Sequence, residues 1–376
     1  MKKGFLITLF GLGLVLIAAC VQGTPVVETV VTTVEVPVER IVTQEVPVEV
    51  VVTEQVETIV EVTPEPLTQV LFRQAWLPDD LYVPFMTALD KGFYEDQGIQ
   101  FVNQIGSGAG TSTRVVGSGA VPIGKGAASV VVQAIAEGLP ITIVLTEHQS
   151  DPGAVCSLPE AGIESGEDLE GISITTSPGD AGQPVLMAAM RQAGLDADSL
   201  NWVIMDPNLW IEALLAGQVD AIGCYISNQP VDLAAQGVDV DVLTVGDLGL
   251  FLPGQVVFVN NDFLAENPEL VKGFVEATLQ GYKYAYENPD EAAQIMSKYY
   301  PEITEDVIKA KWDIIQRVWS SPATDEHGFG WNDPEAYENL QNILLETDLL
   351  SSEVDFSTAL NNSFLEEIDM ESRTLE

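Results

Sequence analysis

Basic residues are scarce in this chain of 376 residues: Lys and Arg number 15 against 57 Asp and Glu, which gives a formal net charge of −42. A surface this negative repels phosphate backbones, so nucleic acid is excluded as a partner. It also argues against docking on anionic lipid through basic residues. Most of the charge, −36, belongs to residues 67–376. An anionic ligand would therefore need local compensation, which favours a neutral one.

Histidine and cysteine are also rare, with two His and three Cys. His148 and His327 lie far apart in the sequence and neither has the spacing of a metal ligand, so we predict no metal site. Cys156 and Cys224 can pair as a disulfide if the chain is secreted, or can remain buried free thiols. The sequence does not say whether their Cα atoms come close enough, and both alternatives stay open.

The common catalytic motifs are missing: no G-x-S-x-G, H-E-x-x-H or Walker A sequence occurs. The glycine-rich loop at residues 106–111 resembles a dinucleotide fingerprint, but Thr111 stands where the third Gly belongs and no acid lies about 20 residues further on. We therefore predict no cofactor. The loop can still present N–H groups to an acceptor atom of a ligand, or be a plain tight connection.

The N-terminus has the pattern of a secretory signal. Lys2 and Lys3 precede an apolar run over residues 4–19, which is too short for a transmembrane helix of about 20 residues. The run ends in Ile-Ala-Ala-Cys at residues 17–20, which resembles the bacterial lipobox. We predict a signal peptide over residues 1–19, lipidation of Cys20 and an extracytoplasmic protein anchored to the membrane. The alternative is an ordinary signal followed by an incidental Cys.

Residues 20–66 predict a stalk between this anchor and the folded body. Residues 21–66 contain 17 Val and nine Glu, and a Val-Pro-Val-Glu unit at residues 36–39 returns at residues 46–49. The recurring prolines oppose a central strand, and like charges favour an extended, stiff spacer. The competing interpretation is a β-arm that packs on the body or on a second copy.

The rest of the chain alternates short apolar segments with helical segments. This order predicts a mostly parallel α/β sheet, and the length predicts two such sheets. After a strand at residues 255–260 the chain becomes mainly helical. Ile308, Trp312, Ile315 and Trp319 recur at helical spacing; a ligand box is conceivable, but a stripe that faces the core is the better interpretation.

Five short segments of the body stand out in order, at residues 76–99, 136–141, 168–171, 214–221 and 267–278. The first segment contains WLP and YVPF, and the other four contain, in order, EGLPI, DLEG, LLAGQVDA and NPE. Ile172, directly after the third segment, replaces an expected Lys. Together they resemble the periplasmic substrate-binding proteins of ABC importers, in the nitrate/sulfonate/taurine and thiamine-pyrimidine-precursor group. The resemblance covers about residues 68–365.

The resemblance implies two α/β lobes joined by a hinge, with a ligand in the central cleft. The first lobe would comprise residues 67–150 and 250–376, and the second residues 151–249 with the crossing segments. It implies that the cleft is lined by Trp76, Tyr82, Gly108, Thr111, Lys125, Ser129, Ser177, Asp180, Asn208 and Tyr225. Trp76 and Tyr82 would sandwich a flat ring or belong to the core. Lys125 would pair with a ligand anion or with Glu147, or be exposed to solvent.

The implied function is capture of a small molecule for delivery to an ABC permease. The opening segment resembles members that bind riboflavin or a thiamine pyrimidine precursor, so a flat nitrogen heterocycle is the expected ligand. An alkanesulfonate, taurine or nitrate-type anion is the alternative. The Cys-rich cluster of the eukaryotic branch, which makes the pyrimidine from its own histidine, is absent here. We therefore expect a transport protein and no enzyme.

Overall fold

The computed structural model describes residues 66–347 and 349–375. They belong to a compact unit, Leu67–Glu376, which is separate from Met1–Pro66. The predicted signal peptide, Cys20 and all but the last residue of the predicted stalk lie outside the described residues. Within the described ranges, no helix combines the length and the apolar character that crossing a membrane requires.

The first of two five-stranded sheets has the order β2-β1-β3-β10-β4. Its strands are β1 (Thr68–Arg73), β2 (Ile99–Gln104), β3 (Ile123–Ala127), β4 (Ile141–Thr146) and β10 (Gln255–Asn260). Parallel pairing joins β1 to β2 and β3, whereas β10 lies antiparallel between β3 and β4. All residues of β4 and β10 are buried, as expected for strands covered on both faces.

The second sheet has the order β7-β6-β8-β5-β9 and repeats this arrangement. Its strands are β5 (Gly153–Ser157), β6 (Ser173–Thr176), β7 (Asn201–Ile204), β8 (Ala221–Tyr225) and β9 (Asp241–Thr244). Here β5 is the antiparallel strand, between β8 and β9. Two mostly parallel α/β sheets are what the alternation of elements predicted, and this fold class is confirmed.

The sequence prediction missed β3 and β5, which have the sequences IGKGA and GAVCS. Glycine and a central Lys are unusual in strands, so propensity alone indicates a loop. The glycines of β3 allow close packing: a Cβ on Gly124 would lie 2.8 Å from Cγ2 of Val116, and one on Gly126 would lie 3.1 Å from Cε1 of Phe258. Tertiary packing therefore overrides local propensity in this strand.

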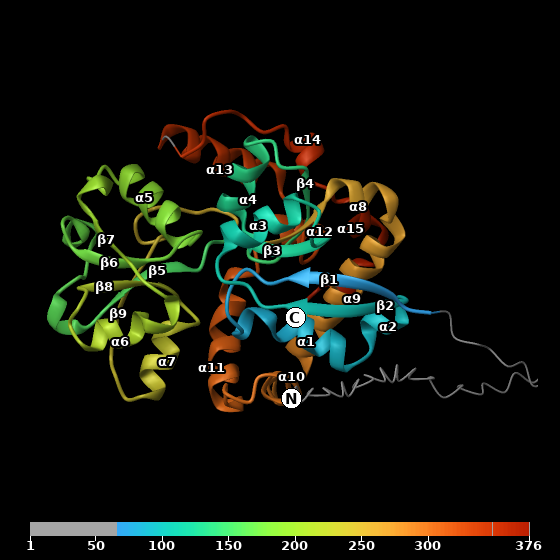
Figure 1. Cartoon of the computed structure of the whole chain (residues 1–376), viewed down its shortest axis with the longest axis horizontal. Coiled ribbons are helices and arrows are strands. Elements are labelled where there is room, and N and C mark those ends of the chain that lie inside the picture. The colour runs from blue at the N-terminus through green and yellow to red at the C-terminus, as the bar shows by residue number, and fades with distance from the viewer. Residues whose placement is uncertain (1–65, 348, 376) are drawn as a thin grey trace, which may run out of the picture. The chain divides into compact units, whose positions relative to one another are not determined.

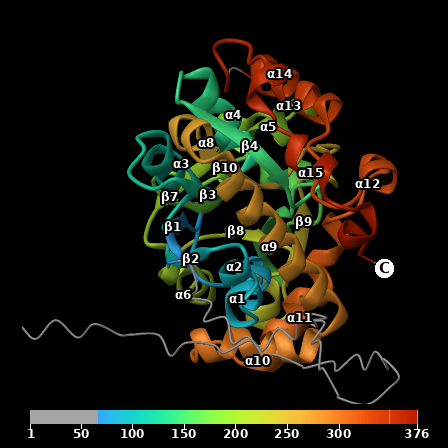
Figure 2. The same ribbon diagram turned by 90° about the vertical axis from the view of Figure 1, so that its right-hand side faces the viewer.

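Helices cover both sheets (Figure 1). Those of the second sheet are α5 (Gly182–Gln192), α6 (Trp210–Leu215) and α7 (Gln229–Ala235). The others are α1 (Val83–Asp90), α2 (Phe93–Asp96), α3 (Ala109–Gly117), α4 (Ala128–Ala136), α8 (Asn261–Glu266), α9 (Pro268–Glu287), α10 (Pro289–Tyr299), α11 (Glu305–Ile315), α12 (Pro322–His327), α13 (Pro334–Glu346), α14 (Phe356–Ala359) and α15 (Ser363–Glu367). Helices α1 and α9 pack on each other beside the first sheet, as Figure 2 shows.

The first sheet has an apolar core on each face. Val257 and Val259 of β10 pack in one core with α1 and α9, and Val256 and Phe258 pack in the other with α4 and α13. The aromatic stripe of α11 lies in the former core, where the rings of Trp312 and Trp319 are 4.8 Å apart. Burial of this stripe agrees with its interpretation as core.

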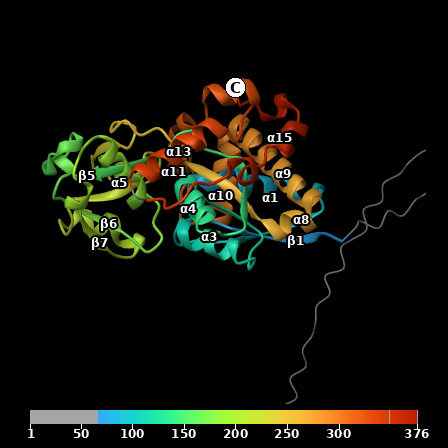
Figure 3. The same ribbon diagram turned by 90° about the horizontal axis from the view of Figure 1, so that it is seen from above.

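We call the first sheet with its helices the first lobe, and the second sheet with α5, α6 and α7 the second lobe. The chain passes from the first to the second through residues 147–152 and returns through residues 245–254. Figure 3 shows the second lobe on one side and α1, α3, α8 and α9 on the other. The first crossing segment leads into β5 and the second leads into β10, so each leads into the antiparallel strand of its sheet. The lobe boundaries predicted at residues 150 and 250 fall in these segments, and the division itself remains a proposal.

Candidate ligand-binding site

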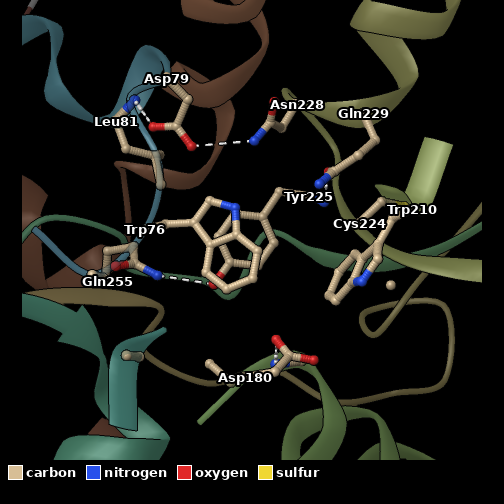
Figure 4. Close-up of a pocket in the computed structure, with 15 residues that line it drawn as sticks. Trp76, Asp79, Leu81, Asp180, Trp210, Cys224, Tyr225, Asn228, Gln229 and Gln255 are labelled. Carbon is tan, nitrogen blue, oxygen red and sulfur yellow. Dashed lines mark hydrogen bonds between the residues drawn. The ribbon is translucent and has the colours of Figure 1, made fainter. Parts of the chain in front are cut away.

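A pocket lies where the two lobes meet, and we call it the inner pocket (Figure 4). The first lobe lines it with the segment after β1, with Ala109 at the start of α3 and with Gln255 at the start of β10. The second lobe contributes residues 180–182 at the start of α5 and Trp210 at the start of α6. It also contributes residues 223–225 at the end of β8 and residues 228 and 229 at the start of α7. Most of the lining thus comes from strand ends and helix starts, where α/β sheets place their ligands.

Two tryptophans, one from each lobe, face this pocket. The ring centroids of Trp76 and Trp210 are 5.8 Å apart and their planes make an angle of 54°. A flat ring stacked between two others needs a spacing of about 7 Å, twice the contact distance between carbon atoms. The cavity of about 60 Å³ holds a few water molecules and no such ring. Admission of a flat ligand therefore requires the indoles to separate by about 1 Å and become parallel.

Tyr82 fixes the segment that carries Trp76. Its ring is fully buried, and its hydroxyl accepts hydrogen bonds from the backbone N–H groups of Ala75 (2.9 Å) and Trp76 (3.0 Å). Both donors would otherwise lack a partner in the turn that follows β1. Tyr82 is therefore a positioning residue behind the pocket, and the aromatic partner of Trp76 across the pocket is Trp210.

Two carboxyl groups from different lobes border the inner pocket. Asp79 accepts hydrogen bonds from the N–H of Leu81 (3.0 Å) and from Nδ2 of Asn228 (3.2 Å), so it links the lobes. Asp180 accepts from the N–H of Gly182 at 3.0 Å. Burial raises the pKa of both, and the neighbouring Asp80 raises the pKa of Asp79 further. Because the described residues that line this pocket include no Lys, Arg or His, it favours donor groups and disfavours anions.

Neutral polar groups complete the lining. Gln255 donates from Nε2 to the hydroxyl of Tyr225 (2.9 Å), and Oε1 of Gln229 accepts from the N–H of Tyr225 (3.1 Å). Burial and the nearby Asp151 raise the pKa of Tyr225, so its phenol stays protonated at physiological pH. The inner pocket thus combines aromatic faces with donors and acceptors at fixed positions, as small-molecule sites do.

A second and larger pocket adjoins the first, and we call it the outer pocket. Its volume is about 440 Å³, and it shares Trp76, Asp79, Trp210, Asn228 and Gln229 with the inner pocket. Lys311 of α11 also lines it, donating from Nζ to Oδ1 of Asn228 (2.6 Å) and pairing with Asp232 of α7 (2.8 Å). This cation is therefore neutralised by the second lobe.

The structure brings together four of the residues predicted for the cleft. Trp76, Asp180 and Tyr225 line the inner pocket, and Trp76 with Asn208 lines the outer pocket. The other residues predicted for the site line neither pocket; they are Tyr82, Gly108, Thr111, Lys125, Ser129 and Ser177. Cys20 lies outside the described residues, and its lipidation remains a prediction.

The glycine-rich loop lies against the second lobe. The N–H of Gly110 donates to the carbonyl of Gly179 at 3.0 Å, and a Cβ on Gly108 would lie 3.0 Å from the same oxygen. Gly108 also has φ +150°, a conformation that other residues rarely adopt. The loop thus serves a close backbone contact between the lobes. Ser129 and Ser177 are almost fully buried, and neither residue lines either pocket.

Lys125 differs most from its expected position. It is fully buried in β3, forms an ion pair with Glu147, and donates to the carbonyl of Leu81 at 2.8 Å. Its ammonium also lies 5.3 Å from the ring centroids of Tyr82 and Phe85. Of the alternatives that the sequence left open, the structure shows the pair with Glu147, because β3 is a central strand and not a loop.

Sequence reasoning missed Trp210, Asn228, Gln229, Gln255 and Asp79. A usable signal was present, because Trp210 and Gln229 each begin a helix soon after a strand of the second sheet. The same rule led to the nearby Asn208 and Tyr225. What the sequence did not show is that the starts of α6 and α7 in the second lobe face the segment after β1 in the first lobe.

Cys156 of β5 and Cys224 of β8 form a disulfide, with their Cα atoms 6.0 Å apart. This pairing resolves the alternative that the sequence left open. Cys224 also lines the inner pocket, so the cross-link holds one wall. In the described part of the chain, no group of three or more His, Cys, Asp or Glu is arranged to hold a metal ion.

Asp80, beneath the inner pocket, gives stability a pH dependence. It is fully buried, and burial raises the pKa of its carboxyl to about 6 from an unfolded value of 3.8. The folded chain therefore binds a proton that the unfolded chain releases, so the free energy of unfolding should fall by about 2 kcal/mol as pH rises from 4 to 6. Urea unfolding of Asp80→Asn across this range should show a flatter profile. An unchanged slope would contradict this assignment.

Comparisons with known proteins identify the family. Residues 81–292 match the family model described as NMT1/THI5 like. The riboflavin-binding protein RibY of Chloroflexus aurantiacus is 29% identical, covering 80% of this chain and 86% of its own. The formylaminopyrimidine-binding protein of Halalkalibacterium halodurans is 24% identical, covering 74% and 85%. A relative in Legionella pneumophila, 27% identical over 61% of this chain and 72% of its own, is named 4-amino-5-hydroxymethyl-2-methylpyrimidine phosphate synthase.

A solved structure shares the fold. The alkanesulfonate-binding protein SsuA of Xanthomonas axonopodis, bound to MOPS, has a TM-score of 0.64 with this chain, covering 78% of it and 97% of SsuA. At 13% sequence identity, this likeness is one of fold. Because the family model covers more than half of the chain, the chain belongs to the NMT1/THI5-like family.

Proposed function

We propose that this chain is the extracytoplasmic substrate-binding protein of an ABC importer. It would capture a flat nitrogen heterocycle, riboflavin or a thiamine pyrimidine precursor, between its lobes and deliver it to the permease. A lipid at Cys20 would anchor it to the membrane, and residues 20–66 would hold the body away from the surface. Two relatives are named as binding proteins for such ligands, which supports this ligand class.

The observation that carries the proposal is the position of Trp76 and Trp210 on separate lobes. A ring held between them would contact both lobes at once, so binding and lobe closure would be coupled. The crossing segments at residues 147–152 and 245–254 would provide the hinge. The disulfide supports an extracytoplasmic location, because such bonds persist in oxidising compartments.

The competing ligand class is a small anion such as an alkanesulfonate, taurine or nitrate. Its support is the fold shared with SsuA. Such an anion would have to bind beside Asp79 and Asp180 in a pocket without a lining cation, and Lys311 of the outer pocket is already paired with Asp232. The electrostatics of the inner pocket therefore favour the heterocycle.

Catalysis of pyrimidine synthesis is the other alternative, since some relatives carry synthase names. Neither His148 nor His327 lines either pocket, and His148 is buried within the first crossing segment. We propose binding without turnover. Incubation with iron, followed by mass spectrometry of the chain, tests this point: loss of mass at a histidine would show that the chain is consumed as a substrate.

Native mass spectrometry of the purified protein tests the ligand class. The panel contains riboflavin, formylaminopyrimidine, its hydroxymethyl counterpart, taurine and a longer alkanesulfonate. We expect one bound heterocycle per chain and no retained sulfonate. Binding of a sulfonate without any heterocycle would overturn the proposed ligand and support the competing class.

Trp76→Ala is expected to weaken binding of the heterocycle about 10- to 100-fold, because stacking on an aromatic side chain is worth about 1–3 kcal/mol. Trp76 is half-buried, so the melting temperature should change little. Trp331→Ala is the matched control: Trp331 is also half-buried, stacks on His327 at 4.2 Å and lines neither pocket. Titration calorimetry should show selective loss in Trp76→Ala. Equal affinities of the two variants would refute the stacking role.

A further inference from the structure

The outer pocket is a second compartment joined to the proposed ring site. It is much larger than the inner pocket, about 440 Å³ against about 60 Å³, and both are bordered by Trp76 and Trp210. A ring stacked between the two indoles would therefore have one edge at the outer pocket. A substituent on that edge would point toward the outer pocket, because the two pockets share five lining residues.

Half of the residues that line the outer pocket are polar, and acidic side chains outnumber basic ones among them. Helix α7 contributes Asp232 and Gln236, and the segment before α11 contributes Glu302 and Thr304. Asp79 adds a third carboxyl, and Lys311 is the only basic residue among the described residues that line it. Since Asp232 already neutralises Lys311, a phosphate or sulfonate would meet net negative charge. Hydroxyl groups, by contrast, can donate to carboxylates and accept from amides.

We propose, building on the proposed function, that the ligand has two parts: a flat ring held between Trp76 and Trp210, and an uncharged polyhydroxyl chain held in the outer pocket. Among the proposed heterocycles this favours a flavin with a sugar-alcohol chain over a single-ring pyrimidine. A single ring would use the inner pocket alone and gain nothing from Asp232, Gln236 or Thr304.

Three flavins separate the contributions of ring, chain and charge. Lumiflavin has a methyl group in place of the chain, riboflavin has the uncharged chain, and flavin mononucleotide carries a phosphate at its end. Quenching of flavin fluorescence measures all three affinities. We expect riboflavin to bind at least 10-fold more tightly than lumiflavin and at least 10-fold more tightly than the mononucleotide.

A substitution that fills the outer pocket gives an independent test. Ala235 is exposed on α7 and lines this pocket, whereas its neighbour Ala234 is equally exposed and lines neither. Ala235→Trp should weaken riboflavin at least 10-fold and leave lumiflavin unchanged. Ala234→Trp should change neither affinity, which controls for the effect of a tryptophan on this helix.

The outcomes are distinguishable. If lumiflavin binds as tightly as riboflavin, the outer pocket holds no chain and this inference is overturned while the proposed heterocycle stands. Tighter binding of the mononucleotide would overturn the requirement for an uncharged chain. If none of the flavins binds and a pyrimidine does, the inference fails and the transport function remains. Absence of binding across all heterocycles would overturn both.

Discussion

Lys125→Met should lower the free energy of unfolding by about 3–5 kcal/mol, the usual cost of removing one partner from a buried ion pair. Both Lys125 and Glu147 have fully buried side chains, and the substitution leaves the Glu147 carboxyl without its cation. It also removes the donor to the carbonyl of Leu81. Urea unfolding followed by tryptophan fluorescence measures the loss. A large drop in stability identifies Lys125 as a core residue.

The surface pair between Lys309 and Asp290 provides the matched control. Its atoms are 3.0 Å apart, but both side chains are exposed, so Lys309→Met should cost less than about 1 kcal/mol. The double variant Lys125→Met with Glu147→Gln should recover much of the loss, because no unpaired charge then remains buried. Selective loss of anion binding in Lys125→Met, with unchanged stability, would instead show that Lys125 serves a ligand.

The pH dependence of this variant supplies a second signature. Burial raises the pKa of Glu147, and Lys125 opposes that rise. Without Lys125 the pKa should rise further, so the folded variant holds a proton that the unfolded chain releases. The deficit relative to wild type should therefore be smaller at pH 5 than at pH 8. A deficit independent of pH would indicate that lost packing, and not an uncompensated carboxylate, explains the effect.

Removal of the disulfide should also have a large effect. Cys156 and Cys224 are separated by 68 residues, and closing a loop of this length stabilises a folded chain by about 4 kcal/mol in the chain-entropy model. The variant Cys156→Ala with Cys224→Ala should therefore unfold at a markedly lower urea concentration than wild type. Because Cys224 borders the inner pocket, the ligand affinity of the double variant should fall as well.

Wild-type protein in reductant is the natural comparison for this variant. Reduced wild type loses the cross-link but keeps both sulfur atoms. The difference in the free energy of unfolding between reduced wild type and the double variant therefore measures how much the packing of the two thiols contributes. We expect reduced wild type to lose most of the stability that the double variant loses. If reductant leaves the unfolding curve unchanged, the cross-link makes no contribution to stability.

Strands with continuous apolar segments, such as β4 and β10, are among those that the sequence predicted. Their side chains are buried on both faces, so the pattern is visible without knowledge of the neighbours. β3 lacks this pattern because its glycines accommodate Val116 and Phe258, which come from other elements. Lys125 lies in this strand, and its pair with Glu147 is one of the alternatives that the sequence left open.

The scarcity of basic residues, the alternation of elements and the family segments were readable from the sequence alone, because each depends on composition or on local order. They determined the fold class, the exclusion of nucleic acid and the expectation of a cleft. The tertiary structure decided that Trp76 faces Trp210, that Cys156 bonds to Cys224 and that Lys125 pairs with Glu147. The first contact depends on how the two lobes meet, and the other two depend on the order of the strands within each sheet. Periodicity along the chain shows which faces are buried, but not which element covers them.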